Sequence, residues 1–294
     1  MKKLLLFVFF MTFTYCARGQ FTYGTTGLLN MPTAEMQKDK TFLFGGGYLE
    51  KHATPSRWTY DTYNYYINIT IFPWLEVAYT CTLHKGLKKD PAYTSAFWPK
   101  QTWGRFVNQD RNFSARLRLW KEGWWQPWTP QIVIGSNDVL HNSWEKGSKL
   151  NMSQSATNGF YSRYYLTVTK HILLNNIGNL GIHLAYLYNK RIKYKLNGIS
   201  LGGNFRFNLK EEDSPINKAI NGINLMVEAY PANGQGTSRV PNKNYPYDRG
   251  LHIGKYDINT GLCYSFWKDR INLYGELYGC KDFSAGLQFK ICLK

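Results

Sequence analysis

Charged side chains occur at alternate positions within several otherwise apolar segments of this 294-residue sequence. Residues two apart lie on the same face of a β-strand, so such a segment presents its charges on one face and its apolar side chains on the other. On this basis we expect one set of residues to line a common interior: Arg116, Arg118, Arg163, Arg206, Lys290, Glu76, Glu228, Glu276 and His183.

Two kinds of chemistry fit this set. Buried charges are costly unless they are paired or hydrated, so the arginines and glutamates could form a structural network that fills the interior. Arginine also forms paired hydrogen bonds with carboxylates and phosphates, so the same residues could hold or pass an anionic sugar chain. The sequence leaves both interpretations open.

Catalytic chemistry has little support in the sequence. It contains no phosphate-binding loop and no zinc motif, and the glutamates are equally well explained as partners of the arginines. The cysteines after the leader, which are Cys81, Cys263, Cys280 and Cys292, are too scattered for a metal or redox motif, and we expect free thiols. We therefore predict a protein that is not an enzyme and binds no metal or cofactor.

Alternation of apolar and polar residues along most of the chain predicts the elements that position these side chains. In 179–209, for example, Leu184 and Leu201 belong to an apolar face, and Ala185 and Ser200 belong to a small or polar one. The predicted strands are 41–52, 62–72, 74–84, 111–121, 128–136, 159–170, 179–188, 195–209, 221–231, 250–266, 270–279 and 282–292. The fold class is all-β, a single antiparallel transmembrane barrel of about 12 strands with a short N-terminal pre-barrel segment.

The lengths of the connections support this fold. Short connections and long connections rich in Pro, Asn, Gly and Lys largely alternate, as in bacterial barrels with short periplasmic turns and long external loops. The segment Asn208–Ala219 is long for such a turn, and 279–282 is short for a loop. Most tryptophans fall at strand ends or in connections, which is typical of interfacial girdles. Sugar stacking is the alternative for Trp98, Trp103 and Trp144.

The start of the chain predicts export. Lys2 and Lys3 precede an apolar run from Leu4 to Phe13, and Ala17-Arg18-Gly19 fits a small-x-small cleavage site. We predict a signal peptide at 1–19, a pre-barrel segment at 20–40 and an outer-membrane barrel at 41–293. The alternative of a lipid anchor at Cys16 is disfavoured because Tyr15 is too large for the preceding position.

Net charge points to an anionic neighbour. The formal charge is +17, and removal of the three cations of the predicted signal leaves about +14. Expected partners are outer-membrane lipid and lipopolysaccharide, with anionic polysaccharide and polysaccharide-export proteins as further candidates. Export argues against nucleic acid.

Several motifs resemble those of YjbH-type outer-membrane proteins. The N-terminal signature is carried by Gly24, Gly27, Met31, Pro32, Thr33 and Ala34. Further similarity lies at Phe72–Val77, Pro130–Gly135, Asp138, Gly202–Phe205 and Leu225–Tyr230. The resemblance implies a barrel associated with exopolysaccharide production and export.

The predicted function is therefore an outer-membrane barrel with a polar cationic lumen that supports exopolysaccharide or capsule assembly, export or retention. One alternative is a general porin-like channel. A second alternative is a secreted β-sandwich that binds glycans.

Overall fold

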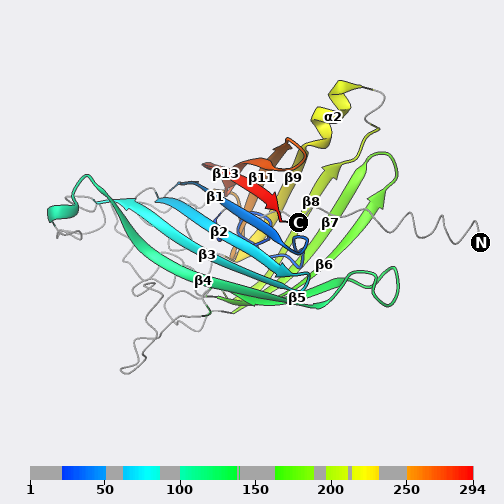
Figure 1. The fold of residues 1–294 in the computed structure, drawn as a ribbon, viewed down its shortest axis with the longest axis horizontal. Coiled ribbons are helices and arrows are strands. Elements are labelled where there is room, and N and C mark those ends of the chain that lie inside the picture. Colours follow the sequence, from blue (N-terminus) through cyan, green and yellow to red (C-terminus); the bar gives the residue numbers. More distant parts are fainter. Residues whose placement is uncertain are drawn as a thin grey trace, which may run out of the picture.

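The protein folds as a closed antiparallel β-barrel in a computed structural model that describes residues 22–50, 62–86, 100–137, 139, 163–188, 197–210, 214–231 and 250–293 (Figure 1). Its twelve barrel strands are β1 (Thr41–Leu49), β2 (Thr62–Phe72), β3 (Leu75–Lys85), β4 (Phe106–Trp120), β5 (Gln131–Ser136), β6 (Tyr164–Leu174), β7 (Gly178–Tyr188), β8 (Gly198–Phe207), β9 (Ile223–Pro231), β11 (Tyr256–Phe266), β12 (Ile271–Tyr278) and β13 (Asp282–Cys292). The predicted all-β barrel of about 12 strands is confirmed.

Closure joins strands that are distant in the sequence. β1 pairs with both β2 and β13, and β9 pairs with β11, so each barrel strand has two hydrogen-bonded neighbours. Closing the sheet gives hydrogen-bond partners to the backbone groups that edge strands would otherwise leave unpaired. The alternative of a β-sandwich is wrong, because one closed sheet replaces two facing sheets.

The predicted strand at 250–266 is interrupted in the structure. Gly254 has a positive φ of 56°, and the chain turns there, so the two-residue strand β10 (His252–Ile253) pairs back onto the start of β11. Other strand boundaries also differ from the prediction. β4 begins five residues earlier than predicted, at Phe106, and β6 continues four residues further, to Leu174.

Side chains divide between the two faces of the barrel as the alternation predicted. Leu184 and Leu201, which are cross-strand partners on β7 and β8, are 42% and 57% exposed on the outer face. Their neighbours Ala185 and Ser200 are fully buried on the inner face. The outer surface is therefore largely apolar, and the inner one is small or polar.

We define the two ends of the barrel by their connections. The turn end carries 73–74, 121–130, 175–177, 208–222 and 267–270, together with the start of β1 and the end of β13. The loop end carries the remaining connections. The unusual length of 208–222 is explained by α2 (Pro215–Asn221), which begins after its N-cap Ser214. A 3₁₀ turn, η2 (Lys100–Thr102), lies in a loop-end connection. No helix in the described ranges is long and apolar enough to span a membrane.

Residues 22–37, which we call the plug, lie inside the barrel. All of them are buried except Glu35, which is half-buried, and the next three residues are exposed. The plug contacts β3 on one side and β9 on the opposite side, six strands away around the barrel. Most of the predicted pre-barrel segment at 20–40 thus crosses the interior of the barrel.

Candidate functional site: the plug and the wall that holds it

The motif residues of the plug form a tight reverse turn. Leu28 N–H donates to Met31 O at 3.0 Å, and Gly27 forms an isolated bridge with Pro32. Gly24 has a φ of +70°, and a Cβ there would lie 2.6 Å from the Cβ of Tyr66. Both its backbone and its surroundings therefore require glycine. The motif encodes a compact shape that fits between the barrel walls.

Glu76 and Arg116 hold the first part of the plug. The Glu76 carboxylate accepts from Thr26 N–H at 2.7 Å and from the Thr26 hydroxyl at 2.6 Å. Arg116 forms a fully buried ion pair with Glu76 at 3.2 Å and donates to Thr26 O at 2.7 Å. Its second nitrogen donates to the backbone carbonyls of Thr33 and Glu35. One guanidinium thus joins both arms of the turn to the wall.

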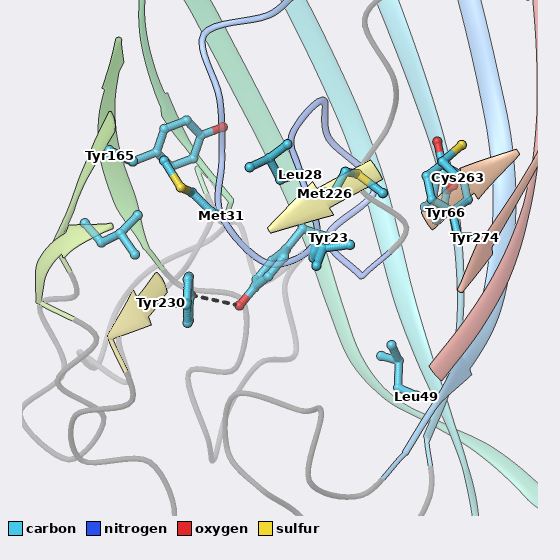
Figure 2. Close-up of a cluster of buried hydrophobic side chains, with 13 residues drawn as sticks. Tyr23, Leu28, Met31, Leu49, Tyr66, Tyr165, Met226, Tyr230, Cys263 and Tyr274 are labelled. Carbon is cyan, nitrogen blue, oxygen red and sulfur yellow. Dashed lines mark hydrogen bonds between the residues drawn. The ribbon is translucent and has the colours of Figure 1, made fainter. Parts of the chain in front are cut away.

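Arg163 holds the tip of the plug. Its Nη1 donates to Asn30 O at 2.7 Å and to the Tyr230 hydroxyl at 2.8 Å. The guanidinium carbon lies 3.6 Å from the centre of the Tyr23 ring. Tyr23 and Tyr230 lie within hydrogen-bond distance at 3.4 Å, which Figure 2 marks with a dashed line. Arg163 therefore joins the tip of the plug to Tyr230 on the barrel wall and to the Tyr23 ring of the plug itself.

Two carboxylates on the opposite wall bind the tip from the other side. Glu228 accepts from Asn30 N–H at 3.0 Å and from Met31 N–H at 2.9 Å, and also from the Asn259 side chain at 2.9 Å. Glu276 accepts from the Asn30 side chain at 2.5 Å. These bonds satisfy backbone donors that the turn leaves without partners inside the plug.

Apolar contacts complete the fit. Leu28 and Met31 pack where Gly202 faces the lumen, and Leu29 packs against Gly261. A Cβ at Gly202 would lie 2.5 Å from Leu28 Cδ1 and 3.0 Å from Met31 Sδ. These wall glycines make room for the side chains of the plug.

We predict that Gly202→Val lowers the free energy of unfolding by about 1–3 kcal/mol through overpacking against Leu28 and Met31. The matched control is Gly203→Val, because the nearest atom to a Cβ at Gly203 lies 3.4 Å away and belongs to Gly181 O. Urea denaturation of the purified barrel followed by tryptophan fluorescence measures the difference. Equal losses at the two positions would contradict this fit of the plug.

A cluster of charged side chains around Glu35, at the end of the plug, is not predicted by the local sequence. His171 lies between two carboxylates, with Nε2 3.0 Å from Glu35 and Nδ1 2.6 Å from Glu122. Lys170 Nζ lies 2.9 Å from Glu122. Burial alone would raise the pKa of Glu122, but the hydrogen bonds and charge of His171 and the bond from Lys170 outweigh it and lower that pKa. The alternation does place His171 on the inner face, but nothing local links it to Glu35.

The predicted interior residues fall into two layers. Arg116, Arg163, Glu76, Glu228 and Glu276 are buried against the plug, and His183 is buried between Thr169 and Asn204, at 2.9 Å from each. The other three cations lie at the turn end. There, Arg118 donates to Pro73 O, Arg206 pairs with Asp269 at 3.0 Å, and Lys290 is half-buried. The plug contacts described above come from the deeper layer.

Other predicted features are only partly described. No disulfide joins Cys81, Cys263, Cys280 and Cys292, and no metal-binding cluster occurs among the residues that the structure covers. Trp103 is half-buried, whereas Trp98, Trp144, Asp138 and the predicted signal peptide lie outside the described residues.

Comparison with known proteins matches the part of the chain that contains the plug. Residues 19–161 match a family model described as "Exopolysaccharide biosynthesis protein YbjH". The protein named "Uncharacterized lipoprotein YjbH" from Escherichia coli (strain K12) is 32% identical over 123 residues, which cover 41% of this chain and 14% of that protein. The matched region therefore spans a small fraction of the relative's length.

The family match includes the plug, Glu76 and Arg116, whereas Arg163, Glu228 and Glu276 lie beyond it. The N-terminal motif on which the resemblance rests is thus the segment that fills the barrel. Residues 19–161 of this chain are thus similar to the YjbH family, whose model is described as an exopolysaccharide biosynthesis protein.

Proposed function

We propose that this protein is an outer-membrane β-barrel, exported with a cleaved signal peptide, that supports the assembly, export or retention of an exopolysaccharide. The match of residues 19–161 to the YjbH family supports the link to exopolysaccharide. The observation that carries the membrane location is the barrel's outer surface, which is apolar around its middle and aromatic at both ends. The proposal assigns the protein no catalytic step.

The outer surface has the layering that a bilayer favours. Exposed aliphatic side chains lie near the middle of the strands, among them Ile67, Ile182, Leu184 and Leu201. Exposed aromatic rings lie at the turn end (Phe72, Trp74, Trp124, Trp125, Trp128 and Trp267) and at the loop end (Tyr63, Phe106, Tyr164 and Tyr188). Aromatic girdles on either side of an apolar band are typical of barrels in outer membranes.

The plug disfavours the alternative of a general porin. Porins keep a water-filled lumen, whereas here buried hydrogen bonds tie residues 22–37 to opposite walls. In this conformation the interior is occupied by the protein's own chain. We therefore favour a specialised role in polymer handling over free diffusion of solutes.

The test follows the protein in the cells that produce it. We expect a heat-modifiable band on gels of unboiled samples, retention in the membrane after a carbonate wash, and reduced secreted or surface polysaccharide when the gene is deleted and restored when it is returned. Purified wild-type protein in planar bilayers should show no steady porin-like conductance. Release into the soluble fraction would refute the membrane location, and unchanged polymer after deletion would refute the polysaccharide role.

A further inference from the structure

We infer that the turn-end mouth of the barrel is a binding site for a polyanionic chain, formed by Arg118, Arg206 and Lys290. This inference deepens the proposed function, and rests on it for the class of ligand, an acidic polysaccharide. It begins from the division of the interior cations into two layers. Arg116 and Arg163 are buried by the plug, while the three turn-end cations remain partly accessible to solvent.

Cross-strand partners place all three side chains on the inner face. Arg118 is opposite Val133, Arg206 is opposite Asn224, and Lys290 is opposite Leu43. Each partner is at most 4% exposed and faces the interior. Directly paired residues share one face of a sheet, so the three cations face inward as well.

The order of the strands spaces these cations evenly around the mouth. Arg118 lies on β4, Arg206 on β8 and Lys290 on β13, and each is four strands from the next around the closed barrel. All three lie within two residues of the turn-end limit of their strands. Because these strands are far apart in the sequence, only closure of the barrel reveals the arrangement.

Spacing favours a chain over a small anion. Four strand spacings correspond to about 19 Å along the wall between the backbones of neighbouring cations, so the three cations are distributed around the whole mouth. A polymer with repeated acidic groups can contact them in turn. Guanidinium groups form paired hydrogen bonds with carboxylates, so Arg118 and Arg206 suit a chain of acidic sugars.

The Asp269 carboxylate should lower the affinity of the site for an anionic ligand. Asp269 pairs with Arg206 at 3.0 Å and therefore competes with an incoming carboxylate. The two side chains are 31% and 26% exposed, so a ligand can reach the pair. Removing the Asp269 carboxylate should strengthen binding, whereas removing the cations should weaken it.

The experiment uses purified full-length barrel in detergent and polygalacturonate as the polyanionic probe, with neutral dextran as its uncharged counterpart. We expect the triple variant R118Q/R206Q/K290Q to bind polygalacturonate at least about tenfold more weakly, because charge-assisted hydrogen bonds are lost. The variant Asp269→Asn should bind more tightly than wild type. Dextran should not bind.

The matched control removes three exposed cations at the opposite end of the barrel, in the variant K85Q/K100Q/R105Q. We expect its affinity for polygalacturonate to stay within about twofold of wild type, since long-range effects of exposed charges are screened by salt. Equal weakening in both triple variants would show attraction to net charge alone and would overturn the site.

Folding and lipid contacts are checked in parallel. Each variant must keep the heat-modifiable band, and Asp269→Asn tests the site even if the triple variant fails to fold. If the triple variant instead loses insertion into phosphatidylglycerol vesicles but binds polygalacturonate normally, the cations contact lipid phosphate and the inference is wrong. The binding assay uses purified protein and does not depend on where the protein lies in cells or on how much polymer they make. A failure of this inference is therefore distinguishable from a failure of the proposed function.

Discussion

Replacing Arg116 with methionine is expected to lower the free energy of unfolding by about 3–5 kcal/mol, because Glu76 is left as a buried charge without its partner. The loss also removes the donors to Thr26 O and to the carbonyls of Thr33 and Glu35. Urea denaturation of the refolded barrel measures the change. The effect should be among the largest of any single substitution because the ion pair is fully buried.

Arg118→Met is the matched control for this prediction. Arg118 lies on the same strand and the same face, but it is half-buried, and the described hydrogen bond of its guanidinium is to Pro73 O. An exposed pair or bond contributes about 1 kcal/mol or less, so the control should lose little stability. Similar losses at the two arginines would show that the plug contacts of Arg116 contribute little.

A double-mutant cycle with Glu76→Gln separates the ion pair from the other plug contacts. If Arg116 and Glu76 act as one unit, the double variant should lose less stability than the sum of the two single variants. Additive losses would contradict coupling across the 3.2 Å contact. The decrease in the free energy of unfolding that the double variant still shows then measures what the hydrogen bonds of the pair to Thr26 and to the plug carbonyls contribute.

Leu184→Arg is expected to have the second large effect, on assembly in the membrane. A charge on the lipid face at the bilayer midplane costs about 2–4 kcal/mol, and Leu184 lies near the middle of β7 and is 42% exposed. The amount of folded, heat-modifiable barrel in the outer membrane should fall sharply. The same substitution at its cross-strand partner Leu201 should behave similarly.

Ile177→Arg is the control for position along the membrane normal. Ile177 is 55% exposed, more than Leu184, but it lies in the turn between β6 and β7. Near the interface the cost of arginine falls to about 0–1 kcal/mol, so assembly should be nearly normal. If the two arginine variants assemble equally well, the middle of the barrel is not in contact with lipid.

Local patterns in the sequence were sufficient to predict the strands and their faces. The assignment of Leu184 and Ala185 to opposite faces needs only the period of two, which any extended chain of L-residues follows. The number of barrel strands follows from the same pattern. Boundaries were less predictable where a turn depends on backbone conformation, as at Gly254, whose positive φ separates β10 from β11.

The sequence by itself therefore determined a closed β-barrel, the sorting of its residues between the two faces and a YjbH-like N-terminal motif. Only the tertiary structure decided what the interior charges bind. The plug has no periodic pattern, and its contacts join residues as far apart as Asn30 and Glu276, so no local signal reports them. Closure likewise determines that Arg118, Arg206 and Lys290 surround one mouth, because strand order around a barrel is set by the pairing of β9 with β11 and of β1 with β13.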